Sequence, residues 1–335
     1  MNLSDIKNAV KNLSIAQMRE LYEFISQEHN NTSLNTHIQE ARFSNGLFCP
    51  KCGCTENIQK FGKRNGIQRY RCKDCGRVFL ATTETIFEGT KKSFAVWEKY
   101  IECMRLGLSV RKSAEACGIA TSTAFVWRHK ILDALTAKRE KDVVLKGVIE
   151  ADETYFRTSY KGSRNLPEGH KPRKRGTKAS KRGLSKYQIC IPCAIDRSGS
   201  AIAKVCNLGK ISTKEMIAFY AGKVKKDAIF CTDSEKSYQG FAAHNGFKLI
   251  QIESGKHKKG VYHINHINAF HNNLKNFSFG FRGMSTKYLN NYLTWYNVLS
   301  MGERTMLTEA VKVNMTETYS ELSKRPAIPL MFEAA

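Results

Sequence analysis

Two pairs of cysteines restrict the fold of the N-terminal third of this chain more than any other feature. Each pair has the spacing C-x2-C, each is followed by glycine, and 19 residues separate the pairs. A tetrahedral zinc site needs four soft ligands about 2.3 Å from the metal, and two such pairs supply them. Because protein would fill all four positions, the zinc is predicted to be structural. The predicted ligands are Cys49, Cys52, Cys72 and Cys75.

The residues between the two pairs have the pattern of a β-hairpin. Asn65-Gly66 is a typical hairpin turn, and the residues on either side of it read as strands. Together with the cysteines, this pattern predicts a zinc ribbon over residues 45–80. Many basic side chains in the hairpin suit contacts with phosphate, although for any single one a solvated charged surface is the better explanation.

The net charge points to a polyanionic partner. The chain carries 54 lysines and arginines against 30 aspartates and glutamates, a formal net charge of +24. Nucleic acid and an anionic membrane surface both fit such an excess. No stretch approaches the roughly 18 apolar residues of a spanning helix, and the N-terminus lacks the apolar segment of a signal peptide. We therefore expect a cytoplasmic, nucleoid-associated bacterial protein that binds double-stranded DNA and no membrane.

Residues 90–140 have the pattern of a helix-turn-helix unit, with Gly118 in the turn between the second and third helices. Such units place the last helix in the major groove of DNA. Here Ala124, Trp127 and Ile131 are predicted to pack inward. A three-helix unit that never touches DNA also fits, but the zinc ribbon and the charge favour DNA binding. The residues predicted to face DNA are Thr121, Ser122, Thr123 and Arg128, one of the first three also capping the helix.

From residue 146 onward, three predicted strands are followed by helix, strand, helix, strand and helix. This order predicts a mixed α/β sheet with helices packed on it. A stretch at 157–187 interrupts the pattern with 11 lysines and arginines, one glutamate and no apolar periodicity. We interpret it as a basic insertion that contacts DNA backbone, with Lys174 and Arg175 near its centre.

The chain of 335 residues is long enough for several domains. We predict an N-terminal helical region, the zinc ribbon, the helix-turn-helix unit, the α/β domain and a C-terminal tail, in that order. Their predicted bounds are 1–44, 45–80, 90–140, 146–305 and 306–335.

Two aspartates end predicted strands of the α/β domain: Asp152 after "GVIEA" and Asp233 after "AIFCT". Carboxylates at strand ends can meet at one edge of a sheet, where sites in such folds form. Two of them repel each other unless a cation lies between them, and oxygen ligands suit Mg²⁺. For each aspartate taken singly, starting a turn is the commoner role. As a pair on this topology, they favour a magnesium site for phosphoryl transfer.

The stretch "HINHINAFHNNLKNF", residues 263–277, reads as a helix with one apolar side. Asn268 and Lys275 fall on nearly one line, about 120–140° from the centre of the apolar stripe. An ordinary surface helix is one interpretation, and a helix that presents these two groups to chemistry is the other. The stripe consists of Ile267, Phe270, Leu274 and Phe277.

Taken in order, these motifs resemble the zinc-ribbon insertion-sequence transposases of the DDE type, with an ISXO2-like domain and a ribonuclease-H-like core. The resemblance covers residues from about 45 to 300. It implies that Asp152 and Asp233 are the first two catalytic acids and that both ligate magnesium. Asn268 then stands where many relatives carry glutamate, and Lys275 matches the basic residue seven positions later. The motifs are "CPKCG", "YRCKDCGRVF", "TETIFEGTKKSFAVWEKY", "LSVRKSAEACGIATSTAFVWR", "IEADETYF", "CTDSEKSY" and "HINHINAFHNNLKNF".

The resemblance implies a DNA transposase that binds the terminal inverted repeats of its element in a synaptic homo-oligomer. It would cleave DNA to free a 3′-hydroxyl and join that hydroxyl to target DNA, with Mg²⁺ as catalytic and zinc as structural cofactor. The amide of Asn268 can ligate Mg²⁺, but it brings no negative charge and cannot act as a general base near neutral pH. This departure keeps a second reading open, a non-catalytic DNA-binding regulator or decayed transposase. Glu153 and Glu235 are alternative third acids that we rank below Asn268.

Overall fold

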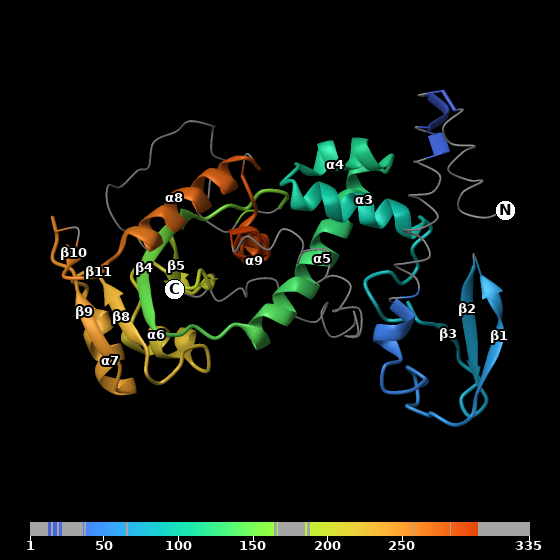
Figure 1. Ribbon diagram of the computed structural model, residues 1–335, viewed down its shortest axis with the longest axis horizontal. Helices are drawn as coiled ribbons and strands as arrows, with labels where there is room; N and C mark the ends of the chain where they lie inside the picture. Colours follow the sequence, from blue (N-terminus) through green and yellow to red (C-terminus); the bar gives the residue numbers. More distant parts are fainter. Residues whose placement is uncertain are drawn as a thin grey trace. The chain divides into compact units, whose positions relative to one another are not determined.

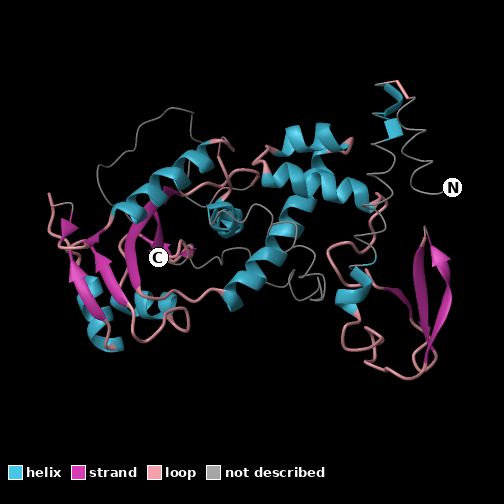
Figure 2. Cartoon of the chain, viewed as in Figure 1, coloured by secondary structure: helices cyan, strands magenta, loops and turns pink. Residues whose placement is uncertain are grey.

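The computed structural model describes most of the chain between residues 38 and 300, in two compact units that meet between Arg128 and His129. Figure 2 shows helices and strands in both units. Most of the predicted helical region, most of the basic insertion with Lys174 and Arg175, and the whole C-terminal tail lie outside the described residues. The described ranges are 38–64, 66–163, 188–256, 258–281 and 283–300, with a few isolated positions elsewhere.

The first unit begins with a small antiparallel sheet in the order β1-β2-β3. Gly66, in the turn between β1 and β2, has φ 77°, a conformation that favours glycine. Phe79 of β3 packs with two of the cysteines, and the ring of Tyr70 stacks on Phe79. This is the architecture predicted for a zinc ribbon. The strands are β1 (Ile58–Arg64), β2 (Ile67–Cys72) and β3 (Val78–Leu80).

Three helices follow the ribbon, as predicted: α3 (Phe94–Arg105), α4 (Val110–Cys117) and α5 (Thr121–Asp142). The hydroxyl of Ser109 accepts a hydrogen bond from the first turn of α4, and Gly118 ends that helix with φ 59°. Aromatic side chains join α3 to the start of α5, because the rings of Trp97 and Trp127 stack at 3.7 Å between centroids. The hydroxyl of Tyr100 also donates to the backbone oxygen of Ala124.

Helix α5 differs from its prediction at its N-terminal end. It begins at Thr121, so none of the three predicted capping residues precedes it, and it runs on to Asp142. Its second half belongs to the second unit, where Thr136 donates to Thr294 at 3.0 Å and Asp133 accepts from Asn291 at 2.7 Å. The two units therefore divide inside α5.

The second unit is built on a mixed sheet in the order β6-β5-β4-β8-β9, with β7 beside β5. Figure 1 labels β5, β4, β8 and β9 of this sheet. Strands β5 and β6 extend the sheet antiparallel to β4 on one side, and β8 and β9 extend it parallel to β4 on the other. This is the predicted ribonuclease-H-like arrangement. The strands are β4 (Val148–Arg157), β5 (Gln188–Asp196), β6 (Ala201–Ala203), β7 (Asn207–Leu208), β8 (Ile229–Thr232) and β9 (Lys248–Gln251).

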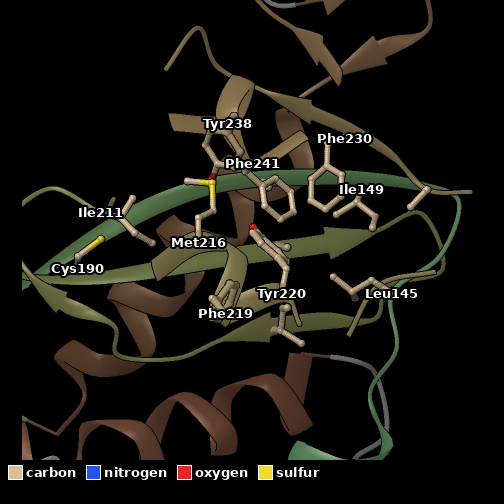
Figure 3. Packing of buried hydrophobic residues seen from close by; sticks show 14 residues of the cluster. Leu145, Ile149, Cys190, Ile211, Met216, Phe219, Tyr220, Phe230, Tyr238 and Phe241 are labelled. Carbon is tan, nitrogen blue, oxygen red and sulfur yellow. The ribbon is translucent and has the colours of Figure 1, made fainter. Parts of the chain in front are cut away.

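Helices cover both faces of this sheet. On one face α6 (Thr213–Tyr220) and α7 (Lys236–Asn245) pack over the strands, and Figure 3 shows their side chains meeting those of the sheet. On the other face α8 (Asn265–Phe279) and α9 (Leu289–Ser300) enclose a second core. A short hairpin, β10 (Lys258–Lys259) and β11 (Tyr262–His263), precedes α8, and η1 (Thr286–Tyr288) precedes α9.

Side chains alternate along β4, so consecutive residues from Ile149 to Asp152 lie on opposite faces of the sheet. Ile149 and Ala151 enter the core under α6 and α7. Because neighbouring residues of a strand point to opposite faces, Glu150 and Asp152 turn toward α8. Contacts of both carboxylates with residues of α8 agree with this alternation. No helix in the described part of the chain is long and apolar enough to cross a lipid bilayer.

Candidate active site and zinc centre

The four cysteines of the ribbon converge in one small cluster. Cys49 Sγ lies 3.6 Å from Cys75 Sγ, and Cys52 Sγ lies 3.6 Å from Cys72 Sγ. All four sulfur atoms lie within 4.8 Å of one another. Zinc–sulfur bonds of about 2.3 Å would place tetrahedral sulfurs about 3.8 Å apart. The cluster therefore fits a structural zinc ion, as the sequence predicted.

The prediction that Asp152 ends its strand is wrong, because β4 continues to Arg157. The apolar run stops at Asp152, but the following residues still pair with β5, from Glu153 opposite Pro192 to Arg157 opposite Gln188. Asp152 therefore lies in the middle of β4.

Asp152 and Asp233 nevertheless lie side by side. Strands β4 and β8 are parallel, and Glu150 pairs with Cys231. Two residues further along each strand, the same register brings Asp152 beside Asp233, just past the end of β8. Each carboxylate accepts a backbone N–H that follows it, from Glu153 at 2.8 Å and from Glu235 at 3.0 Å.

Asp152 is partly buried next to a second carboxylate, an arrangement that a bound cation would stabilise. Its side chain is 23% exposed. Burial and the negative charge of Asp233 raise the pKa of Asp152 to about 6, against the lowering effects of the Glu153 N–H and the Lys275 ammonium. A divalent cation between the two carboxylates would remove this repulsion, and carboxylate oxygens are the ligands that Mg²⁺ prefers. The two residues thus fit a magnesium site.

Helix α8 has the predicted division of its sides. Ile267, Phe270 and Leu274 are buried in the core beneath it. Asn268 and Lys275 are exposed. Lys275 acts electrostatically on Asp152 and lowers the pKa of that carboxylate. The structure therefore brings Lys275 to the aspartate pair and places Asn268 two turns earlier on the same side of the helix.

Sequence reasoning missed His271, which touches the site directly. Its Nδ1 lies 3.6 Å from Asp152 Oδ2, and its side chain is 10% exposed. Burial and the charge of Lys275 lower the pKa of His271 to about 4, so the imidazole is neutral at neutral pH. Its Nε2 is buried without a hydrogen-bond partner among the described residues. The spacing of Asn268, His271 and Lys275 at i, i+3 and i+7 was the signal that would have found it.

The two alternative acids lie elsewhere. Glu153 faces α7, and its carboxylate accepts a hydrogen bond of 2.7 Å from the Tyr238 hydroxyl. Burial raises the pKa of Glu153 to about 7. Glu235 caps α7 and forms an ion pair of 2.8 Å with Lys210. Both glutamates thus have partners away from α8.

The predicted DNA-facing residues of α5 separate into two groups. Thr121 and Ser122 are exposed, and Thr123 is half-buried. The prediction for Arg128 is wrong, because its side chain is fully buried and donates to the backbone oxygen of Leu108 at 2.7 Å. Arg128 lies four residues after Ala124, on the buried side of the helix. The exposed side instead carries two apolar side chains, Phe125 (38% exposed) and Val126 (49% exposed).

Comparison with known proteins shows that the second unit is similar to one family of domains. Residues 144–296 match the ISXO2-like transposase domain. Over 261 residues, 76% of this chain and 86% of the relative, the sequence is 25% identical to an uncharacterized protein in transposable element ISH50 of Halobacterium salinarum.

Two solved structures are similar at low sequence identity. A pre-cleavage Mos1 transpososome is 10% identical, with 62% of this chain and 75% of that chain covered and a TM-score of 0.23. A simian T-cell lymphotropic virus intasome with a PP2A regulatory subunit is 12% identical, with 69% and 76% covered and a TM-score of 0.26. TM-scores this low support no conclusion about the fold. The fold assignment therefore depends on the order and direction of the strands alone.

Proposed function

We propose that the protein is a transposase that binds the terminal inverted repeats of an insertion sequence and catalyses Mg²⁺-dependent DNA strand cleavage and strand transfer. The match of residues 144–296 to the ISXO2-like transposase domain supports this proposal. One observation carries the catalytic part of the proposal. Asp152, on β4, lies beside Asp233, which directly follows the parallel strand β8, and α8 brings the ammonium of Lys275 to the same place.

Each residue of this site has a part in the proposed reaction. Bound divalent cations would stabilise the charge on the attacking and leaving oxygens of an in-line displacement. Asp152 and Asp233 offer their oxygens, which the backbone N–H groups of Glu153 and Glu235 hold in place. Lys275 donates to the phosphate next to the scissile bond, as a charge-assisted hydrogen bond.

Asn268 takes the third position of the site in this proposal. Its amide oxygen would ligate the cation or orient a water, but it would add no negative charge, so cation affinity would be lower than with a carboxylate. Replacing Asn268 with alanine should therefore weaken strand transfer, and Asn268→Asp should tighten cation binding. Full strand transfer by Asn268→Ala would refute the ligand role.

The exposed side of α5 is the proposed base-reading surface. Thr121 and Ser122 offer hydroxyls to base edges, and Val126 offers an apolar contact to the methyl group of thymine. Arg111 and Lys112, exposed in the first turn of α4, would contact phosphates.

We further assign DNA backbone contacts to the basic insertion at 157–187, including Lys174 and Arg175. Each phosphate contact adds close to one unit to the salt slope of DNA binding. Deleting the insertion should therefore flatten the salt dependence, and an unchanged slope would refute this role.

The test of the proposal is cleavage of end DNA by purified protein in Mg²⁺. Wild-type protein should release a product with a 3′-hydroxyl at the element end, whereas Asp152→Ala should release none. Asp152→Ala should still bind the same DNA, because Asp152 lies outside the unit that carries the ribbon and the helix-turn-helix. Absence of any cleaved or joined product with wild-type protein would refute the enzymatic function.

The amide at position 268 favours one other function, a DNA-binding regulator or decayed transposase without catalysis. Such a protein would bind the terminal repeats with the same specificity but leave them uncut at any Mg²⁺ concentration. The same assay therefore distinguishes the two functions. Intact Asp152, Asp233 and Lys275 argue for the enzyme.

A further inference from the structure

A buried carboxylate lies two residues before Asp152 on the same side of β4. The side chain of Glu150 is 1% exposed. A carboxylate buried this completely is strongly destabilising unless hydrogen bonds and opposite charges compensate its lost hydration. The partners of Glu150 therefore indicate what it does.

Two of these partners are backbone N–H groups of the first turn of α8. Glu150 Oε2 accepts from the N–H of His266 at 2.7 Å and from the N–H of Ile267 at 3.2 Å. The first N–H groups of a helix have no partner within the helix, and a residue before the helix usually supplies one. Ile264 precedes α8 and has no polar side chain. The anchor of α8 thus comes from β4, where Glu150 lies 116 residues before His266 in the chain.

Three side chains complete the surroundings of Glu150. Its Oε1 lies 2.8 Å from His266 Nδ1, 3.2 Å from His263 Nδ1 and 3.2 Å from Arg197 Nη2. Arg197 follows β5, and its Nη1 donates to His263 Nε2 at 2.8 Å. The network therefore joins β4, the turn after β5 and the start of α8 around one carboxylate.

We propose that Glu150 is a positioning residue that fixes where α8 presents Asn268 and Lys275 to the aspartate pair. The proposal rests on the proposed function of that pair. Glu150 and Asp152 are two residues apart on one strand, a rise of about 6.7 Å. On α8, His271 contacts Asp152 and lies four to five residues after the two anchored N–H groups. That separation corresponds to a rise of about 7 Å along the helix. The distance from the anchor to the aspartate site is therefore about the same along β4 as along α8.

A metal ion is the other occupant that this cluster suggests. Ligand atoms of Glu150, His263 and His266 lie within 4.8 Å of one another. The guanidinium of Arg197, however, already contacts Glu150 and His263. A metal cation bound there would have to displace the guanidinium of Arg197, which is also positively charged. We therefore assign the cluster to anchoring α8.

The test compares Glu150→Gln with a matched control, Glu215→Gln. Glu215 also accepts hydrogen bonds at a helix N-terminus, that of α6, but on the opposite face of the sheet. In Glu150→Gln, the amides of His266 and Ile267 should exchange hydrogen about tenfold faster or more, because a charged acceptor is lost. Mn²⁺ affinity, followed by electron paramagnetic resonance, and kcat for cleavage should each fall about 10–100-fold, as for other residues that orient ligands. Glu215→Gln should leave exchange in α8, Mn²⁺ affinity and kcat unchanged.

A second variant covers the case in which Glu150→Gln does not fold. The side chain of His266 is 53% exposed, so His266→Asn removes one partner of Glu150 without leaving a large cavity. His266→Asn should speed hydrogen exchange in α8 and lower Mn²⁺ affinity, each by a smaller factor than Glu150→Gln.

Unchanged exchange and unchanged Mn²⁺ affinity in these variants would overturn the proposal. So would a second equivalent of zinc in the wild-type protein that His266→Asn loses. Should wild-type protein prove inactive on DNA, the proposed function fails, while exchange in α8 still decides whether Glu150 anchors the helix.

Discussion

Replacing Asp152 with asparagine should make the cation-free protein more stable while abolishing catalysis. Burial and the nearby Asp233 raise the pKa of Asp152 from 3.8 to about 6. Each tenfold change in proton affinity corresponds to about 1.4 kcal/mol, so keeping Asp152 ionised in the folded protein at neutral pH costs about 3 kcal/mol. An asparagine amide oxygen can still accept the N–H of Glu153 but carries no charge. The expected rise in melting temperature is roughly 6–12 °C for a unit of this size.

The pH dependence of this difference follows from the same pKa. The folded protein binds the Asp152 proton more tightly than the unfolded chain does, so the destabilisation by Asp152 is complete above pH 6. It fades as the pH falls from about 6 to 3.8, and only below 3.8 is the carboxyl group mainly protonated in both states. The advantage of Asp152→Asn should therefore be largest at neutral pH and vanish below pH 3.8.

Calorimetry of the full chain measures this prediction in buffer free of added divalent cations. The transition of interest is the one whose midpoint rises with Mg²⁺ in the wild-type protein. In Asp152→Asn that midpoint should start higher and respond less to Mg²⁺. Serine in place of the exposed Asp227 is a control that should change neither value. If Asp152→Asn proves no more stable than wild type at neutral pH, the repulsion inferred between Asp152 and Asp233 is wrong.

Three further predictions concern the ribbon, DNA reading and the phosphate contact. Cys72→Ser should lose one bound zinc per chain and the hydrogen-exchange protection of β1–β3 but keep that of β4 and β8, since the cysteine cluster is the core of the ribbon. Wild-type protein should bind repeats with thymine about fourfold more tightly than repeats with deoxyuridine at the contacted position, because one buried methyl contributes about 0.8 kcal/mol. Val126→Ala should lose this preference, and equal discrimination by both proteins would contradict the contact. Lys275→Met should lower kcat for cleavage about 10–100-fold with little change in repeat binding, and an unchanged kcat would remove Lys275 from the site.

Local patterns in the sequence were enough for the ribbon and for the order of strands and helices. The spacing of Cys49, Cys52, Cys72 and Cys75 restricts a short segment by itself, so nothing distant is needed to interpret it. The strands and helices of the second unit follow from apolar periodicity in the same way. Hydrophobic alternation does not specify how strands pair, however, so the alignment of β4 with β8 came only from the structure.

The two wrong predictions, for Asp152 and Arg128, also have physical causes. Asp152 looked like a strand end because the apolar run stops there, but pairing with β5 holds β4 extended to Arg157. Arg128 was predicted to face DNA, although its position four residues after Ala124 places it on the buried side of the helix. The role of Glu150 depends on groups more than 100 residues away along the chain, and no local pattern predicts a buried carboxylate with such partners.

Strand joining by the aspartate pair tests the account most directly. A pre-cleaved repeat end with a free 3′-hydroxyl is incubated with supercoiled target DNA, Mg²⁺ and either wild-type protein or Asp233→Asn, and joined molecules are counted by sequencing across the junction. The wild-type protein should join the 3′-hydroxyl covalently to target DNA and Asp233→Asn should not, although both should bind the end equally. Equal joining by the two proteins, or none by the wild type at any Mg²⁺ concentration, would contradict it.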